Sequence, residues 1–278
     1  MISFLNDSLF LIPWPWPLII NVSAMGLLAL TAFAKKSLSP SGAAAAFIVG
    51  VITLQTVRFE GFLLFLLFFV SCNVVGKVSG RIQSITTQRK IEKKGSCRDA
   101  MQVLANGLMA VLAALLWQFS AKQSAIIMFG AAIAEATSDT FAGEIGRLSK
   151  KAPVSILTRR PVEKGLSGGV TVLGTFAAFF SSLAIAICWL LWFKASIAQA
   201  AIVCLLGFCG AILDSFLGAF AQAQYKDPES GKITEHEEIN GQKLELVRGI
   251  RWIDNDMVNL MSNVFSAVFA LGMSALVL

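Results

Sequence analysis

Long apolar runs alternate with short polar segments along nearly the whole chain. Most of these runs approach or exceed the roughly 18 residues that a helix needs to cross a bilayer. They occupy 9–34, 61–75, 99–119, 123–145, 168–193, 197–221 and 252–278. Run 41–57 is shorter and rich in small residues, so it either crosses the membrane or enters it as a re-entrant helix. The pattern predicts an all-α, polytopic transmembrane helix bundle with about seven or eight spans, folded as one integral membrane domain over residues 1–278.

Composition supports this fold and excludes several classes of protein. Hydrophobic residues make up 56% of the chain and charged residues 14%, which is too apolar for a water-soluble enzyme. A β-barrel would instead show alternating segments of about ten residues. The cysteines form no CxxC pair and His236 is the only histidine, so a zinc site or a Ser-His-Asp triad has almost nothing to be built from. We expect no cleavable signal peptide, because the N-terminus lacks a basic region before its apolar run.

The net charge of +6 is concentrated in polar loops, at about 77–98, 147–167 and 225–251. The positive-inside rule makes these loops cytoplasmic, and eight spans then leave both termini outside. If 41–57 does not cross, the count falls to seven and the N-terminus moves inside. Basic loops of a membrane protein attract anionic lipid heads or phosphates, so nucleic acid is not an expected partner. The chain is expected in the lipid bilayer of the cytoplasmic (inner) membrane, if bacterial, with its site facing the cytoplasm.

Two apolar runs end in similar short sequences that carry an acid. Asp139-Thr-Phe-Ala-Gly143 is echoed by Asp214-Ser-Phe-Leu-Gly218, and a charge at bilayer depth costs at least about 2.5–3.5 kcal/mol, so it marks a candidate functional site. Each copy closes the second helix of a predicted hairpin, which suggests a parallel internal repeat. A third cluster, Asp254-Asn-Asp-Met-Val-Asn259, opens the last run at the same level. The acids are therefore predicted to converge on one cavity that faces the cytoplasm.

Clustered carboxylates with neighbouring hydroxyls and amides suit a hard cation such as Mg²⁺, which usually joins one or two carboxylates to substrate phosphates. Phosphoryl transfer needs in-line positioning, a metal ion and cationic groups for the developing charge. Basic residues are present near the acids at Arg98, Arg159, Arg160 and Lys164. Glycines at 165, 168 and 169 precede a helix, where exposed backbone N–H groups form an anion site. The GxxxxGK[ST] order of a Walker A loop is absent.

Structural alternatives exist for several of these residues. Glu144 either binds metal or faces the lipid headgroups. Glu135 lies one helical turn before Asp139 on the same face, so it either adds a ligand or hydrogen-bonds across the bundle. The glycines are either a phosphate cradle or a packing turn, and Asn106 is expected to make a polar contact to the bundle interior. The charged run 227–245 is expected to be a solvated loop.

Five sequence blocks, in order, carry a resemblance to a known family. They are Arg98-Asp-Ala-Met-Gln-Val-Leu-Ala-Asn-Gly107, Ser138-Asp-Thr-Phe-Ala-Gly-Glu-Ile-Gly146, Gly168-Gly-Val-Thr-Val-Leu-Gly174, Asp214-Ser-Phe-Leu-Gly218 with Gln222, and Asp254-Asn-Asp-Met-Val-Asn259. The chain resembles the polytopic membrane family that includes eukaryotic transmembrane protein 19 and the plant phytyl-phosphate kinases. The resemblance implies that Asp139, Glu144, Asp214, Asp254 and Asn259 hold metal and phosphates. The chain departs from the family pattern at Leu166-Ser167 and at Thr158-Arg-Arg-Pro161, which leaves donor and substrate preference open.

The sequence hypothesis is a membrane-embedded, Mg²⁺-dependent kinase that converts an isoprenoid monophosphate of the prenyl or phytyl type to the diphosphate, with CTP or ATP as donor. The candidate catalytic residues are Asp139, Asp214 and Asp254, and Glu144 joins them as a candidate metal ligand. The candidate substrate-binding and phosphate-binding residues are Arg98, Asn106, Lys164, Ser167, Gly168, Gly169, Asn255 and Asn259. The alternatives are a transporter or flippase of a lipid phosphate or small anion, and a nucleotidyltransferase that acts on a lipid phosphate. A homo-oligomer is compatible with the small residues of 41–57.

Overall fold

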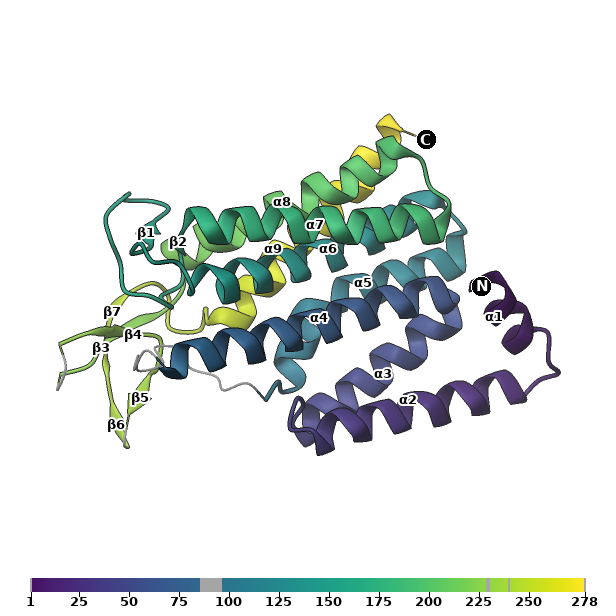
Figure 1. Ribbon diagram of the computed structural model, residues 1–278, viewed down its shortest axis with the longest axis horizontal. Helices are drawn as coiled ribbons and strands as arrows, with labels where there is room; N and C mark the ends of the chain where they lie inside the picture. Colours follow the sequence, from purple (N-terminus) through teal and green to yellow (C-terminus); the bar gives the residue numbers. More distant parts are fainter. Residues whose placement is uncertain (1, 86–96, 229–230, 240, 278) are drawn as a thin grey trace.

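The computed structural model describes residues 2–85, 97–228, 231–239 and 241–277, and within these ranges it is an elongated bundle of helices (Figure 1). The helices are α1 (Ile2–Phe10), α2 (Trp16–Ala34), α3 (Pro40–Thr56), α4 (Arg58–Ile85), α5 (Ala100–Ser120), α6 (Gln123–Gly146), α7 (Val172–Phe193), α8 (Ile197–Phe220) and α9 (Asn255–Met273), followed by the 3₁₀ turn η1 (Ser274–Leu276). Seven of the helices in the described part of the chain are long and apolar enough to span a membrane. The prediction of an all-α membrane bundle is confirmed.

Helix α6 forms the centre of the bundle and packs against α4, α5, α7, α8 and α9. Its residues from Ala125 to Ser138 are buried without interruption. This helix is rich in alanine and glycine, and such small residues let neighbouring membrane helices approach closely. At Gly130 a Cβ atom would lie 2.7 Å from the ring of Trp189, whose Nε1 donates a hydrogen bond to the Ile126 carbonyl at 3.1 Å. Acids near the end of α6 are therefore held on a rigid, fully surrounded element.

The first apolar run is shorter than the predicted span 9–34. The chain forms the short helix α1 and turns, and the long helix α2 begins only at Trp16. Proline lacks a backbone N–H, so Pro13 and Pro15 interrupt helical hydrogen bonding, whereas Pro17 fits the first turn of a helix. The spanning part of this run is therefore the 19 residues Trp16–Ala34.

Helix α3 corresponds to the ambiguous run 41–57. Its Ser39 N-cap accepts a hydrogen bond from the Gly42 N–H at 3.1 Å, and its 17 residues extend about 25 Å at ~1.5 Å per residue. Helices α2 and α4 run in the same direction, and α3 returns the chain between them (Figure 1). The bundle thus contains seven long spans and one shorter apolar helix that reverses the chain direction.

The predicted loop 77–98 begins too early. Helix α4 continues through Lys77 and Arg81 to Ile85, because no proline or glycine pair stops its hydrogen-bond ladder there. Its extension also packs on α6, where the Ser79 hydroxyl donates a hydrogen bond to the Glu144 carboxylate. The remainder of this predicted loop includes residues 86–96, which lie outside the described residues.

The two predicted hairpins are α5–α6 and α7–α8. In both, the first helix ends at a residue in the left-handed region, Ala121 with φ 51° and Lys194 with φ 52°. Asp139 and Asp214 each lie about two turns before the end of a 24-residue helix. This similarity is compatible with a parallel repeat, which stays a prediction.

The polar segments contain short strands that the sequence analysis did not predict. One of them, β2, takes the start of the predicted run 168–193, so α7 begins only at Val172. Strands β1 (Val154–Ser155) and β2 (Gly169–Val170) pair within the α6–α7 connection. The α8–α9 connection holds a sheet of order β4-β3-β7, made of β3 (Gln224–Lys226), β4 (Ile233–Thr234) and β7 (Glu245–Arg248), and a hairpin of β5 (Glu238–Ile239) and β6 (Gln242–Lys243).

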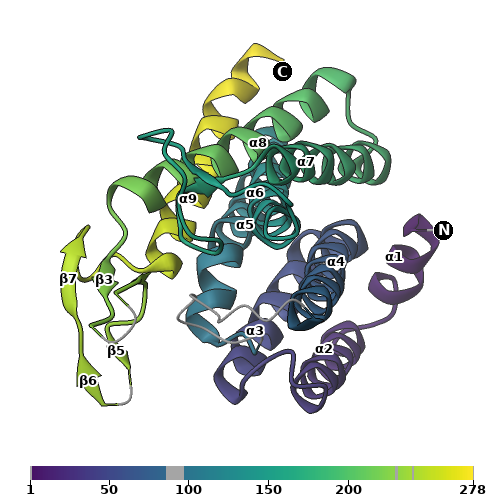
Figure 2. The same ribbon diagram turned by 60° about the vertical axis from the view of Figure 1, so that its left-hand side comes forward.

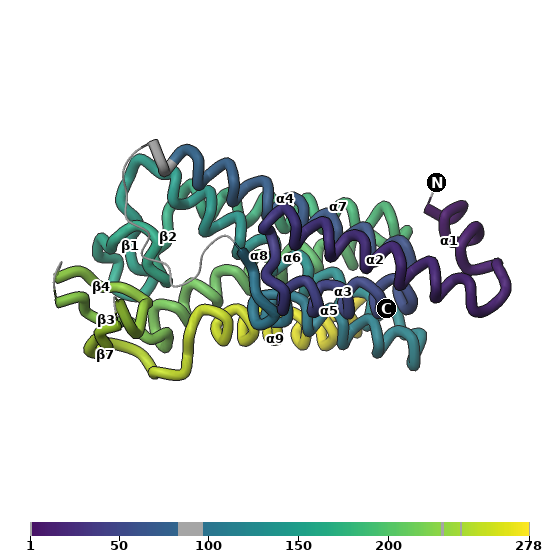
Figure 3. The backbone as a smooth tube through the Cα atoms, turned by 90° about the horizontal axis from the view of Figure 1, so that it is seen from below, coloured from purple at the N-terminus to yellow at the C-terminus, as the bar shows by residue number. Residues whose placement is uncertain are grey.

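The prediction of a loop at 227–245 is therefore wrong for the paired strands β4, β5 and β6. The segment is nevertheless solvated in part, since Gln242 and Lys243 of β6 are exposed. Ala223, Tyr225 and Leu244 are buried together, with Ile239 and Leu246 packed against them, and this small apolar cluster holds the strands of the connection together. Figures 2 and 3 show the strands gathered at one end of the helices, whereas α1 lies at the other end. The polar connections thus form a cap over one end of the bundle.

Candidate functional site

A cavity of about 360 Å³ opens beneath this cap, between the ends of α4, α6, α8 and α9 and the two strand-bearing connections. All but one of the candidate catalytic, metal-binding and phosphate-binding residues line it. These are Arg98, Asn106, Asp139, Glu144, Ser167, Gly168, Gly169, Asp214, Asp254, Asn255 and Asn259. Lys164 is not part of the lining. Its ammonium donates a hydrogen bond to the Ser149 carbonyl at 2.5 Å, within the α6–α7 connection.

Two carboxylates from different hairpins meet in this cavity. Asp214 of α8 lies within hydrogen-bonding reach of Asp139 of α6. Asp214 Oδ2 also lies 3.0 Å from the side-chain nitrogen of Asn259 and 3.2 Å from the Ser262 hydroxyl, both on α9. Because two neighbouring carboxylates repel each other, this pair needs a shared proton or a bound cation between them. We call Asp139 and Asp214 the acid pair.

The start of α9 supplies the third predicted cluster. Asp254 is the N-cap of α9, and its Oδ1 accepts a hydrogen bond from the Met257 N–H at 3.1 Å. Asn255 and Asn259 follow on the cavity side, and Asp256 is 4% exposed. The helix N-terminus and its polar first turn therefore form one wall of the cavity.

Glu144 forms part of the opposite wall, where its carboxylate already has partners. Oε1 accepts a hydrogen bond from Arg147 at 3.0 Å, and Oε2 accepts one from Ser79. The side chain thus joins α6 to α4. In the part of the chain that the structure describes, no three His, Cys, Asp or Glu side chains form a ready-made metal cluster. A cation here would be held mainly by the acid pair.

The glycine segment acts as a packing turn. Gly168 has φ +79°, and a Cβ atom there would lie 2.5 Å from the backbone of Ala219 at the end of α8. The Gly169 N–H donates to the Leu166 carbonyl at 3.1 Å. The two glycines that end the repeated motif have different surroundings. Gly218 packs against the turn at Ser167 and Gly168, whereas Gly143 has open space beside it.

One backbone donor of the glycine segment already holds an anionic group. The Ser167 N–H donates a hydrogen bond to Glu235 Oε1 at 2.7 Å, and Glu235 is buried in the cap. A hydrogen bond that a carboxylate accepts is stronger than a hydrogen bond between neutral groups. The turn therefore binds a carboxylate from the cap at the point where a phosphate was predicted.

Cationic side chains surround the same space. Lys36, Lys77, Arg98, Arg147 and Arg251 all line the cavity. Arg98 is held by its backbone, since its N–H donates to the Ser37 carbonyl at 3.1 Å and its carbonyl accepts from Ser39 at 2.9 Å.

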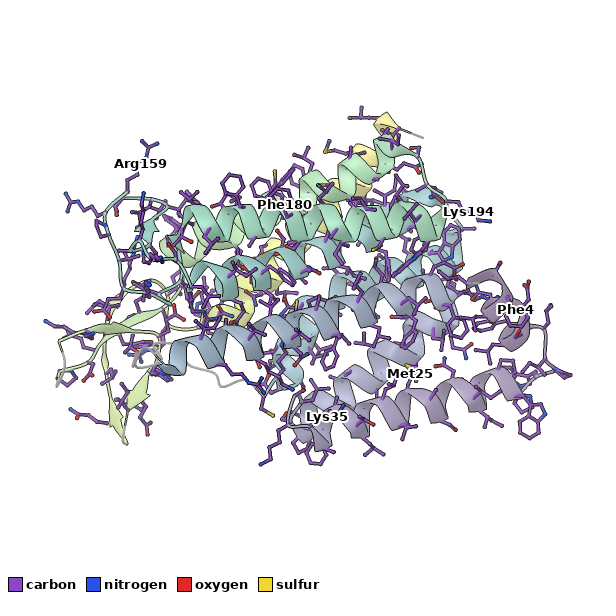
Figure 4. The ribbon with its side chains drawn as sticks, in the orientation of Figure 1. Phe4, Met25, Lys35, Arg159, Phe180 and Lys194 are labelled. Carbon is purple, nitrogen blue, oxygen red and sulfur yellow. The ribbon has the colours of Figure 1, made fainter. Side chains whose placement is uncertain are left out.

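Two basic residues noted in the sequence lie outside the cavity lining, and one amide in the lining is bonded to its own helix. Arg159 and Arg160 do not line the cavity, and Arg159 projects away from the bundle (Figure 4). Asn106, although in the lining, donates a hydrogen bond to the Gln102 carbonyl of its own helix at 3.0 Å.

Sequence reasoning missed most of the lining residues that the α8–α9 connection contributes. Gln222, Tyr225, Glu235 and Arg251 line the cavity. Burial, followed by the nearby Glu237 carboxylate, raises the pKa of Tyr225. The only signal in the sequence was Gln222 beside the second motif, because the other residues lie in a segment without regular apolar spacing.

One family model and several known proteins match this chain over most of its length. The model of the integral membrane protein family DUF92 matches residues 23–267. The chain belongs to the DUF92 family. Among relatives, Protein PGR of Arabidopsis thaliana is 31% identical over 276 residues, covering 88% of this chain and 92% of its own. An uncharacterized membrane protein of Synechocystis, sll0875, is 30% identical over 267 residues, covering 95% and 92%.

A more distant relative is Protein VTE6, chloroplastic, of Arabidopsis thaliana. It is 24% identical over 246 residues, covering 87% of this chain and 66% of the relative. No solved structure matches the chain. Membership of DUF92 agrees with an integral membrane protein, and it covers the acid pair, both connections of the cap and most of α9.

Proposed function

We propose that this DUF92 protein is a membrane-embedded, Mg²⁺-dependent phosphotransferase. It would convert an isoprenoid monophosphate of the prenyl or phytyl type to the diphosphate, with CTP or ATP as donor. The observation that carries the proposal is the acid pair, which two hairpins bring together in a cavity lined by cationic side chains. The similarity to VTE6, and to the family that includes the plant phytyl-phosphate kinases, supports the same reaction class.

The donor set of the cavity fits a magnesium ion. Asp139 and Asp214 would hold it, with the Asn259 amide beside Asp214, and Mg²⁺ commonly takes one or two carboxylates and completes its shell with phosphates and water. When bound, the ion would neutralise charge on the phosphate oxygens and help align them.

The cationic residues would bind and orient the two phosphate groups. Arg98, Arg147 and Arg251 line the cavity from three different parts of the chain, so they can contact a donor and an acceptor together. An oxygen of the lipid monophosphate would attack the terminal phosphorus of the nucleotide. The bond from that phosphorus to its bridging oxygen would break, and the nucleoside diphosphate would leave. A protein base is not required, because a monoester oxygen is already largely ionised near neutral pH.

The position of the cavity favours this reaction over transport. The cavity lies at the capped end of the bundle, below the polar connections. Transporter sites lie near the bilayer midplane, with access from both sides in turn. A lipid phosphate would reach the cavity from the bilayer with its apolar tail still among the helices.

The test uses the full chain purified in detergent with Mg²⁺. Phytyl, geranylgeranyl and undecaprenyl monophosphates would be offered with radiolabelled CTP or ATP, and the lipid product identified. We expect a labelled lipid diphosphate. A nucleotidyl-lipid would instead establish nucleotidyl transfer. Saturable binding of a lipid phosphate without turnover by any donor would overturn the kinase and favour the transporter.

The Glu235 carboxylate gives a separate prediction. In Glu235→Ala the Ser167 N–H loses its internal acceptor and becomes available to a phosphate. A hydrogen bond to a charged group is worth about 1.5–3 kcal/mol, so the KM for the phosphate substrate is expected to fall by at least about tenfold. Initial rates across substrate concentrations would measure this.

The matched control is Glu238→Ala, which removes an exposed carboxylate from the same cap outside the cavity lining. Its KM is expected to match that of the wild type. A raised KM in Glu235→Ala alone would mean that Glu235 supports substrate binding instead of competing with it.

A further inference from the structure

Polar side chains continue from the acid pair into the interior of the bundle. Asn259, Ser262, Asn263 and Ser266 follow the spacing i, i+3, i+4 and i+7, so they share one face of α9. Two of them, Ser262 and Asn263, contact Glu135, which lies one turn before Asp139 on α6. Glu135 is 1% exposed, and Ser262 and Asn263 are fully buried. The proposed reaction does not use this buried carboxylate.

Glu135 is hydrogen-bonded across the bundle through both of its oxygens. Ser262 Oγ donates to Oε1 at 2.8 Å, and Asn263 Nδ2 donates to Oε2 at 2.6 Å. Helix α8 closes the third side at Gly210, where a Cβ atom would lie 2.5 Å from Glu135 Cγ. The sequence left two alternatives for Glu135, an added metal ligand or a hydrogen bond across the bundle. The structure shows the hydrogen bonds across the bundle.

The Ser262 hydroxyl connects this contact to the acid pair. Its single proton has three acceptors in reach, namely Glu135 Oε1 at 2.8 Å, the Asn259 carbonyl at 3.0 Å and Asp214 Oδ2 at 3.2 Å. Glu135 is the nearest acceptor. With the proton directed there, Asp214 Oδ2 keeps the side-chain nitrogen of Asn259 as its hydrogen-bond donor.

We infer that Glu135 and Ser262 are positioning residues that fix the Asp214 carboxylate for cation binding. The inference rests on the proposed function. Glu135 sets the direction of the Ser262 hydroxyl. The Ser262 oxygen then lies 3.2 Å from Asp214 Oδ2 without donating to it, and it limits rotation of that carboxylate by contact. Without the Glu135 acceptor, the hydroxyl turns to Asp214 and competes with a cation for the carboxylate oxygen.

Ser262 has a matched control on the same helix. Ser266 is also fully buried, and its hydroxyl also bonds across the bundle, to the Leu206 carbonyl at 2.9 Å. In Ser262→Ala and Ser266→Ala the same hydroxyl is removed, but only Ser262 touches the acids. If both serines only link helices, the two variants should change cation affinity to a similar extent. If Ser262 positions Asp214, only Ser262→Ala should weaken cation binding.

The experiment measures binding of Mn²⁺, a paramagnetic substitute for Mg²⁺, to the full chain in detergent by electron paramagnetic resonance. Losing a group that orients a metal ligand typically weakens metal affinity by about 10–100-fold. That loss is expected in Ser262→Ala, with Ser266→Ala close to wild type. Thermal unfolding of both variants shows whether each is folded.

Glu135→Gln is the second variant, since it keeps the side-chain volume and one acceptor oxygen for Ser262. Its Mn²⁺ affinity is expected to lie between those of the wild type and Ser262→Ala. Equal Mn²⁺ affinities in Ser262→Ala and Ser266→Ala would overturn the positioning role alone. Wild-type protein that binds no Mn²⁺, or binds it equally well after Asp214→Asn, would refute the proposed metal site itself.

Discussion

Asp139→Asn and Asp214→Asn are each expected to lower the rate of lipid diphosphate formation by at least about a hundredfold, in line with the loss of a single group that stabilises transition-state charge. Asparagine keeps the volume of the side chain but removes the negative charge that would hold the cation. Both residues are expected to be needed, because each supplies one carboxylate of the acid pair that forms when α6 and α8 pack together. Radiolabelled product formation at saturating Mg²⁺ would give the rates.

The control for this charge change is Asp7→Asn, on the exposed surface of α1 at the far end of the bundle. It is expected to retain wild-type turnover. Full turnover in Asp214→Asn would remove the acid pair from the mechanism. Size-exclusion chromatography and thermal unfolding would separate lost chemistry from lost folding.

Gly168→Ala is expected to have the largest effect on stability. The residue has φ +79°, which costs an L-residue roughly 1–2 kcal/mol. The added Cβ would also lie 2.5 Å from the Ala219 backbone, which cannot rotate away as a side chain could, and overpacking adds about 1–3 kcal/mol. The turn must then leave α8, so both the thermal midpoint and the activity are expected to fall.

Gly231→Ala isolates the backbone contribution to this effect. Gly231 has φ +69°, but apart from its chain neighbours no atom of the described residues lies within 4 Å of the position that its Cβ would take. It is therefore expected to lower the thermal midpoint by less than Gly168→Ala and to leave activity unchanged. Equal losses in the two variants would show that packing against Ala219 contributes nothing.

The apolar pattern predicted most of the helices, because the bilayer demands long apolar segments with internally satisfied backbones. The boundaries were less predictable. The pattern placed the end of α4 before Lys77, yet the helix continues to Ile85, since a charged side chain ends the contact with lipid without ending the helix. The strands of the cap were missed because pairs of two to four residues leave no periodic signal.

The candidate site was predictable where motifs mark it and hidden elsewhere. The echo of Asp139 in Asp214 identified the acid pair before any geometry was known. By contrast, Lys164 appeared suitable for phosphate binding, but its ammonium is directed to Ser149. Ser262 could not be selected from the sequence, since one serine in an apolar helix looks like any other.

The sequence by itself determined that this is a polytopic membrane protein, and it identified the acids at the ends of two hairpins. Apolar length and the cost of buried charge are local properties, and they need no knowledge of neighbours. Only the tertiary structure decided which partners the acids have. Glu144 pairs with Arg147 and Ser79, Glu135 bonds to α9, and Glu235 reaches Ser167 from the cap. These contacts depend on helix packing and on close approaches at Gly168 and Gly210, where neighbouring helices or turns leave no room for a side chain.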